Sequence, residues 1–338
     1  MQIDNDSYIN EYRNCTLCPR TCGVDRTKKR GYCRELSELH VARASLHMWE
    51  EPCISGKRGS GTVFFSGCNM GCVFCQNKTI SRGKTGKIIS IDRLVDIFFE
   101  LEDMGANNIN LVTGDMFIPT IRKAIDIAKS RGIGIPFLMN TSSYISVETL
   151  KSLEGLIDIY LPDFKYIRNQ DAIRYSNSPG YVEAAKAAIS EMVRQQPECV
   201  FGNDERLMEQ TGKDNVVEEK TPDEAGMNSA SKCTPEQGML QKGVVVRHLL
   251  MPGMIIQAKL IVKYLYEHYG NSIYISLMNQ YTPNGNLSEF PEIDRKVTSS
   301  EYDSLIDYAA QIGVINGFMQ IGETATESFI PEFDCRGV

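Results

Sequence analysis

The chain has 338 residues, with 36 basic and 43 acidic side chains and a formal net charge of −7. That length allows one large domain or two ordinary ones and an extensive buried core. The acidic balance argues against bulk nucleic-acid binding, which needs a basic face. No apolar run approaches the roughly 18 residues of a membrane-spanning helix, and the N-terminus lacks the basic start and apolar core of a secretory signal. We therefore expect a cytoplasmic protein with no membrane or nucleic-acid partner.

Cysteine is concentrated at the start of the chain. Of the 11 cysteines, eight fall within the first 75 residues, where an even spread would place about two or three. These eight are Cys15, Cys18, Cys22, Cys33, Cys53, Cys68, Cys72 and Cys75. In a small secreted protein such clustering indicates disulfides. In a long cytoplasmic chain it more often indicates metal or redox chemistry.

From Thr62 onward, short apolar runs alternate with amphipathic helical stretches. The apolar runs, which predict strands buried on both faces, are 62–66, 108–112, 135–139, 157–161, 244–250 and 272–278. The stretches with apolar residues at helical spacing are 91–104, 119–130, 146–154, 180–195, 255–268 and 299–311. This alternation predicts an α/β fold of parallel β/α units. Six units are fewer than the eight of a full barrel, so we expect a partial (β/α)6 barrel, with 314–321 as a candidate seventh strand.

The chain divides by pattern into three parts. Residues 1–58 form a Cys-rich N-terminal segment, residues 59–321 the barrel, and residues 322–338 a C-terminal tail. Within the barrel, residues 202–238 break the rhythm, since they contain no Phe, Tyr or Trp and carry nine acidic and four basic residues. That composition predicts a flexible surface insertion.

Cys68, Cys72 and Cys75 form a Cx3CxxC motif directly after the predicted strand 62–66. Three thiolates within eight residues can bind one face of a small inorganic cluster. A [4Fe–4S] cluster usually takes four Cys ligands, so this motif would leave one iron open to a ligand from outside the protein. The position supports this interpretation, because the chemistry of β/α barrels gathers at the C-terminal ends of the strands. The alternative is three buried thiols that pack as small hydrophobic groups.

With Phe74 before its last cysteine, the motif resembles the signature of radical S-adenosylmethionine (SAM) enzymes. This resemblance implies a partial barrel of the radical SAM type. Two further strand ends also resemble this superfamily. Residues 113–115 (TGD) resemble its Gly-Gly-Glu segment, from which Thr113 and Asp115 depart, and residues 140–144 resemble its ribose-binding segment.

Other segments resemble pyruvate formate-lyase activating enzymes. Residues 163–165 (DFK) are similar to their Asp-Leu-Lys, and Arg247 matches their Arg-x-x-x-x-Pro-Gly strand. Residues 15–26, 51–56 and 274–281 resemble the PflX-type homologues of these enzymes. The likeness covers nearly the whole chain except the insertion 202–238.

The resemblance implies a role for each of these residues. The amino and carboxylate groups of SAM would chelate the open iron of a [4Fe–4S] cluster. The residues implied in binding the cofactor are Phe74, Gly114, Asp115, Asn140, Ser142, Asp163, Lys165 and Arg247. Lys165 and Arg247 would hold the carboxylate through charge-assisted bonds, Asp115 would accept from the amino group, and Phe74 would pack against adenine. One electron from a donor such as flavodoxin or ferredoxin would cleave SAM to methionine and a 5′-deoxyadenosyl radical, which abstracts hydrogen from a substrate.

A second group of four cysteines precedes the barrel. Cys15, Cys18, Cys22 and Cys33 lie within 19 residues, and four thiolates can complete the coordination shell of a zinc ion or of an iron–sulfur cluster. The spacing does not decide between these two metals, and Cys53 could replace one member of the group.

Two classes of function remain open from the sequence. The first is a radical SAM oxidoreductase that abstracts hydrogen from a substrate, which the resemblance to activating enzymes suggests is a protein. The second is a zinc or iron–sulfur protein without turnover, such as an electron carrier. The open coordination position favours the enzyme, since a binding protein has no need of three ligands where four are available.

Overall fold

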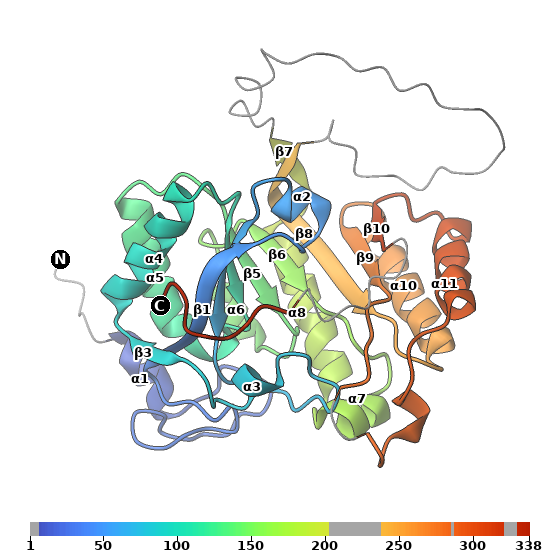
Figure 1. The fold of residues 1–338 in the computed structure, drawn as a ribbon, viewed down its shortest axis with the longest axis horizontal. Coiled ribbons are helices and arrows are strands. Elements are labelled where there is room, and N and C mark those ends of the chain that lie inside the picture. The colour runs from blue at the N-terminus through green and yellow to red at the C-terminus, as the bar shows by residue number, and fades with distance from the viewer. Residues whose placement is uncertain (1–6, 203–237, 285–286, 321–329) are drawn as a thin grey trace.

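The computed structural model describes residues 7–202, 238–284, 287–320 and 330–338. Its centre is a mostly parallel sheet in the order β10-β9-β8-β6-β5-β4-β2-β1-β3, with β7 paired to β8 (Figure 1). The strands are β1 (Leu39–His47), β2 (Ser60–Phe65), β3 (Lys87–Ile89), β4 (Ile109–Val112), β5 (Phe137–Thr141), β6 (Ile159–Pro162), β7 (Val200–Gly202), β8 (Met239–Leu249), β9 (Tyr274–Met278) and β10 (Gly317–Met319).

Helices connect the strands of this sheet, and most of them cover its outside. They are α1 (Ser7–Arg13), α2 (Pro52–Ser55), α3 (Lys78–Ser81), α4 (Ile91–Asp103), α5 (Ile118–Ser130), α6 (Val147–Lys151), α7 (Asn169–Ser176), α8 (Tyr181–Gln195), α10 (Ile255–Tyr269) and α11 (Ser299–Gln311), with short 3-10 helices η1 (Asp115–Phe117) and η3 (Pro291–Ile293). Each helix predicted from the sequence is present. The capping box of α11 is also present, with the Thr298 side chain accepting from the Glu301 backbone and the Glu301 side chain accepting from Thr298.

The predicted α/β partial barrel is confirmed. All six expected strands are present, and the candidate seventh is β10, which pairs parallel with β9. These seven strands run parallel to one another from β2 to β10. In the described part of the chain the sheet order ends at β3 and β10, which do not pair with each other, so the barrel stays open between them.

Strand β1 was not predicted. It lies within the Cys-rich segment 1–58 and pairs antiparallel with β2, with Val41 opposite Phe65. The C-terminal residues run beside it, because Cys335 N donates to Ala42 O and Ala44 N donates to Arg336 O. The N-terminal segment and the end of the chain thus extend the barrel sheet on the β2 side.

Alternating side chains of the parallel strands separate an outer and an inner layer. On β5, Phe137 and Met139 pack in the large core shared with the helices, whereas Leu138 belongs to a second cluster. That second cluster lines the inside of the barrel, where Cys53 and Ile54 of α2 join it. Because side chains alternate with period two, Asn140 falls on the same inner face as Leu138. The inner face is therefore apolar toward the start of the strands and polar toward their C-terminal ends.

The predicted insertion lies almost entirely outside the described residues, which stop at Gly202 and resume at Gly238. Its two ends are nevertheless placed. Gly202 on β7 pairs with Met239 at the start of β8, and at about 3.3 Å per residue the eight residues from Met239 to Arg247 span about 26 Å. The insertion therefore leaves the barrel at the opposite end of β8 from Arg247.

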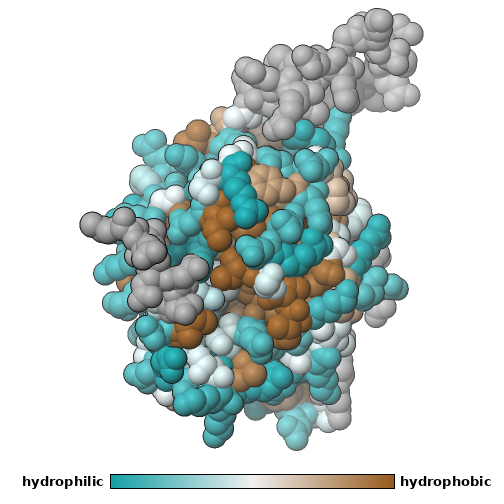
Figure 2. All heavy atoms as spheres, turned by 90° about the vertical axis from the view of Figure 1, so that its left-hand side faces the viewer, coloured by the Kyte–Doolittle hydropathy of each residue, from teal (hydrophilic) through white to brown (hydrophobic). Residues whose placement is uncertain are grey.

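The surface of the described residues carries no membrane-spanning element, since none of their helices is long and apolar enough to cross a bilayer. Figure 2 shows the side of the molecule that carries β3 and α4, where hydrophobic side chains gather among hydrophilic ones. Ile88 and Met104, on and next to these elements, are each 55% exposed. Apolar atoms form much of any protein surface, so these residues alone identify no binding site.

Candidate active site

A cavity of about 270 Å³ opens at the C-terminal ends of the parallel strands. The predicted residues that line it are Cys68, Cys72, Phe74, Cys75, Asn140, Ser142, Asp163, Lys165 and Arg247. Residues 113 and 141, together with Glu50, Trp49 and Tyr281, complete much of the remaining wall. The structure thus brings together, around one cavity, side chains from loops that are far apart in the sequence.

The Cx3CxxC loop follows β2 and is held by the end of α7. Gly71 N donates to Ser176 O over 2.9 Å, and Val73 N donates to Tyr175 O over the same distance. On the other side, the Asn69 side chain donates to Tyr144 O over 2.6 Å. These bonds fix the backbone of the loop, so that its three thiols face the cavity together.

The thiols of the loop are desolvated. Burial raises the pKa of Cys68, and the neighbouring Cys72 and Cys75 raise it further. Burial also raises the pKa of Cys72, although Lys165 opposes the shift. With their pKa values raised, Cys68 and Cys72 stay protonated at neutral pH, and a bound metal would supply the charge that stabilises the thiolates.

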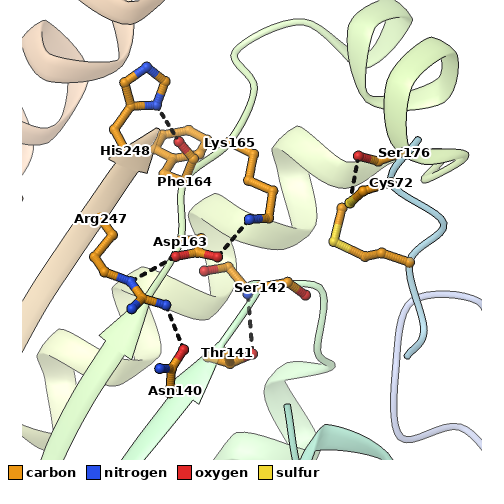
Figure 3. A network of polar contacts seen from close by, with 12 residues as sticks. Cys72, Asn140, Thr141, Ser142, Asp163, Phe164, Lys165, Ser176, Arg247 and His248 are labelled. Carbon is orange, nitrogen blue, oxygen red and sulfur yellow. Dashed lines mark hydrogen bonds and ion pairs between the residues drawn. The ribbon is translucent and has the colours of Figure 1, made fainter. Parts of the chain in front are cut away.

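Ser176 donates a hydrogen bond from Oγ to the Cys72 sulfur over 2.9 Å (Figure 3). A second hydroxyl lies behind it, with Tyr166 Oη 2.7 Å from Ser176 Oγ. The sequence did not point to Ser176, which lies 104 residues from Cys72 in the chain. A hydrogen bond to a cysteine sulfur is one of the features that set the potential of an iron–sulfur site.

Asp163 lies between two cations at the ends of β6 and β8 (Figure 3). Its Oδ1 accepts from Arg247 Nε over 2.9 Å, and its Oδ2 accepts from Lys165 Nζ over 2.6 Å. Burial works against the ionised form, but Arg247 and Lys165 outweigh it and hold the pKa of Asp163 below its usual value. The three predicted residues therefore form one charged network.

Glu50 is a member of this network that the sequence did not reveal. One carboxylate oxygen accepts from Arg247 Nη1 over 3.1 Å, and the other accepts from the side chains of Asn110 and Asn140. Arg247 Nη2 donates to Asn140 Oδ1 over 2.5 Å. All three nitrogens of the Arg247 guanidinium are thus engaged by protein groups. A single acidic residue in a loop carries no local sequence signal, so Glu50 could not have been found without the fold.

Asp115 is fully buried behind the wall of the cavity. Thr141 donates to its Oδ1, while its Oδ2 has no partner among the described residues. Burial raises the pKa of Asp115 to about 6, with the bond from Thr141 opposing the shift. Gly114 faces the core instead of the cavity, since a Cβ there would lie 2.7 Å from the Ile121 side chain.

Two residues at neighbouring strand ends have left-handed backbone conformations. Thr113 has φ of 57° and Ser143 has φ of 64°. For a β-branched residue such as threonine this conformation is a genuine outlier, and such outliers gather at functional sites. Glycine adopts this conformation without cost. Residue 113 is Thr where the segment that 113–115 resemble has Gly, and its backbone nevertheless has the conformation that a glycine would favour.

The residues predicted to hold ribose and adenine also line the cavity. The Ser142 hydroxyl is buried there with no partner among the described residues. Asn140 is engaged by Glu50 and Arg247, as described above. Phe74 is 7% exposed and packs against Tyr281 at 5.6 Å between ring centroids. By contrast His248, next to Arg247, turns away and bonds to Phe164 O over 2.8 Å, and burial lowers its pKa to about 4.

The four N-terminal cysteines lie close to one another, beside the Cx3CxxC loop. Burial raises the pKa of Cys18, and the nearby thiols of Cys15, Cys33 and Cys22 raise it further. The backbone of Cys33 also meets the Cx3CxxC loop, since Cys33 O accepts from Cys68 N over 3.3 Å. Cys53 is elsewhere, in the apolar cluster inside the barrel. Within the described residues, no three His, Cys, Asp or Glu side chains are arranged to hold a single metal ion.

Comparison with known proteins finds a similarity in the central part of the chain. Residues 62–202 match the family model described as the Radical SAM superfamily. An uncharacterized protein of Methanocaldococcus jannaschii is 26% identical over 308 residues, which cover 89% of this chain and 75% of the relative.

Two larger proteins of known structure align with part of this chain. SuiB of Streptococcus suis, bound to S-adenosylmethionine, aligns with a TM-score of 0.43 and 11% identity, over 75% of this chain and 48% of SuiB. The FeFe-hydrogenase maturase HydG of Carboxydothermus hydrogenoformans aligns with a TM-score of 0.42 and 13% identity, over 78% of this chain and 58% of HydG. The chain thus spans about half the length of these two proteins. The part of the chain that matches the Radical SAM superfamily model, residues 62–202, includes the Cx3CxxC motif and Asp163.

Proposed function

We propose that this chain is a radical SAM enzyme that abstracts a hydrogen atom from a partner protein, as pyruvate formate-lyase activating enzymes do. The superfamily implies an enzyme that uses a [4Fe–4S] cluster and SAM. The observation that carries the proposal is one cavity, lined by the three motif thiols and by the network of Asp163, at the open end of an incomplete parallel barrel.

The residues around the cavity fit both cofactors. Three thiols from one short loop provide three ligands for a cluster and leave a fourth iron open. The unpartnered hydroxyl of Ser142, which lines the cavity, is a buried donor and acceptor of the kind that a polar ligand would satisfy. When bound, the cluster and SAM supply one-electron cleavage to methionine and a 5′-deoxyadenosyl radical, with the electron coming from a donor such as flavodoxin or ferredoxin.

The side chains of the network would orient SAM. The Lys165 ammonium has three donors, of which Asp163 takes one, so Lys165 can reach the methionine carboxylate through a charge-assisted bond. Arg247 already binds Asp163, Glu50 and Asn140. Its role in this proposal is to hold those three side chains in position.

The open barrel supports a protein as the substrate. A barrel closed by eight strands would enclose the cavity laterally, whereas here the described sheet ends at β3 and β10 without pairing. In this proposal a peptide loop reaches the cavity from the side on which the sheet is not closed. The single tryptophan, Trp49, lines the cavity and is 61% exposed, which leaves an aromatic side chain at the mouth for contact with a partner.

The test begins with enzyme reconstituted anaerobically with iron and sulfide and given SAM and a chemical reductant. We expect slow formation of 5′-deoxyadenosine and its stimulation by cell extract, with Cys72→Ala inactive and Cys199→Ala as the matched control that stays active. The stimulating fraction should be retained by a small-molecule cutoff membrane and lost after protease treatment. A fraction that passes the membrane and survives protease would overturn the protein substrate, and the absence of any 5′-deoxyadenosine would favour a protein without turnover.

A further inference from the structure

The four N-terminal cysteines are folded toward one point. Cys15 N donates to Val24 O, and Gly23 N donates to Cys15 O over 3.1 Å. These two bonds close the chain from 15 to 24 into a tight loop. A Cβ placed on Gly31 would lie 3.4 Å from the Cys33 sulfur and 3.7 Å from the Cys22 sulfur. Thiols from both ends of the segment therefore approach the same glycine.

A buried cation lies beside these thiols. Arg26 is 0% exposed, and its Nη1 is 3.9 Å from the Cys15 sulfur. Its other acceptors in the described part of the chain are the backbone carbonyls of Glu35, Leu36 and Met116. No carboxylate of the described residues bonds to it, although a buried charge is costly without an opposite one. Among the described residues, the thiols of Cys15 and Cys33 lie near Arg26 and could balance its charge when ionised. The Tyr12 ring, with its centroid 5.1 Å from the guanidinium, stays neutral because burial raises the pKa of its hydroxyl.

The spacing of the first three thiols mirrors that of the Cx3CxxC motif. Cys15, Cys18 and Cys22 form CxxCx3C, with three thiols in the same eight-residue span in the reverse order. Cys33 adds a fourth and is joined to the second motif through the bond from Cys68 N to Cys33 O. Arg20 strengthens this contact, because its Nε donates to Asn69 O over 2.5 Å while its guanidinium stacks on Tyr32.

We propose that Cys15, Cys18, Cys22 and Cys33 bind a second [4Fe–4S] cluster, fully ligated by protein, and that Arg26 balances its negative charge. In a cubane each cysteine binds a different iron, and all four sulfurs are used, so this site has no open position. Four thiolates give the site the anionic charge that the buried Arg26 lacks in the metal-free chain. The inference does not rest on the proposed hydrogen abstraction, because metal binding here is measurable without the first motif.

The test uses a triple variant, Cys68→Ala/Cys72→Ala/Cys75→Ala, reconstituted anaerobically with ferrous iron and sulfide and then desalted. We expect about four irons and four sulfides per chain, with the Mössbauer spectrum of a [4Fe–4S] cluster. Adding Cys18→Ala/Cys22→Ala should reduce iron to background, whereas adding Cys199→Ala should leave it unchanged. A folded triple variant that holds no iron, or that holds one zinc which iron and sulfide do not displace, would overturn the proposal.

Arg26→Gln tests the role of the cation separately. Removing a positive charge next to the cluster disfavours the more negative reduced state, so the reduction potential of the N-terminal cluster should become more negative. Arg26→Lys keeps the charge and should retain more of the wild-type potential. If Arg26→Gln fails to fold, Arg26→Lys is compared with the parent triple variant instead. Lysine is shorter and loses the bond to the Cys15 sulfur, so the reduction potential should again become more negative, by a smaller amount. An unchanged potential in an iron-loaded variant would contradict the charge-balancing role.

Discussion

Asp163 and Arg247 face each other across the neighbouring strand ends of β6 and β8, where Arg247 Nε donates to Asp163 Oδ1 over 2.9 Å. The backbone reinforces the pair, because Phe164 N donates to Arg247 O over 2.8 Å. Lys165 binds the second carboxylate oxygen of the same aspartate. Asp163 thus holds two cations at the floor of the cavity, and Glu50 adds a second anion on Arg247.

Asp163→Asn should therefore destabilise the protein. Removing one member of a buried charged network leaves the others without compensation, at a cost of about 3 kcal/mol, although Glu50 still binds Arg247 in the variant. The free energy of unfolding in urea, followed by circular dichroism on the metal-free protein, measures the loss. Asp303→Asn, at an exposed position of α11, should change stability by less than about 0.5 kcal/mol. Equal stabilities for the two variants would show that the network contributes nothing.

Cys72→Ala should remove the iron of the first motif and reduce 5′-deoxyadenosine formation to background, because two thiols from this loop cannot hold three irons. The measurement is iron content together with SAM cleavage, made in a Cys18→Ala/Cys22→Ala background so that the N-terminal site does not contribute. Cys199→Ala in the same background is the control, since Cys199 lies beside Gly243 in the first half of β8. Full SAM cleavage by the Cys72 variant would exclude a cluster at this motif.

The strand ends were predictable because the sequence pattern there is local. Leu138 and Asn140, two residues apart on β5, already show the apolar-to-polar change along the inner face. Glu50 was not predictable in the same way. It reaches the barrel interior from a loop and meets Arg247 across 197 residues of chain, and no pattern in residues 48–58 indicates that direction.

Strand β1 shows a different limit of the sequence pattern. Residues 39–47 alternate between buried and partly buried positions over much of their length, which is a strand signal. The cysteines on either side of these residues indicate metal binding and say nothing of a strand. An antiparallel partner for β2 also does not follow from β/α alternation. The pairing of β1 with β2 and β3 depends on contacts that only the folded chain provides.

Replacing 203–237 by a short Gly/Ser turn should leave cofactor chemistry intact. Gly202 and Met239 are already paired on antiparallel strands, so a hairpin turn can join β7 to β8 without moving either. The junction also lies at the far end of β8 from Arg247. We expect the shortened chain to fold and to form 5′-deoxyadenosine within about twofold of wild type, by the usual tolerance of surface loops to length changes. An unfolded product would mean that the segment belongs to the core.

Asp115 should make stability depend on pH in a defined window. Its folded pKa of about 6 lies above the usual 3.8, so the folded state binds this proton more tightly than the unfolded state. The stabilisation is complete below about pH 4 and is lost as pH rises through about 6, and two pKa units correspond to about 3 kcal/mol. Asp115→Asn removes this titration. The difference in unfolding free energy between the metal-free variant and wild type should grow in favour of the variant from pH 4 to pH 7, and parallel curves would contradict the raised pKa.

Ser176→Ala should lower the reduction potential of the cluster at the first motif. The Ser176 hydroxyl donates to the Cys72 sulfur, and such a bond stabilises the more negative reduced cluster. Burial keeps the pKa of Tyr166 well above its usual value, so Tyr166 remains a donor to Ser176 and polarises that bond. Tyr166→Phe should consequently shift the potential in the same direction by a smaller amount. Redox titration followed by EPR, in the background without Cys18 and Cys22, measures both shifts. If Tyr166→Phe changes the potential more than Ser176→Ala does, then the Tyr166 hydroxyl does not act on the cluster only through its bond to Ser176.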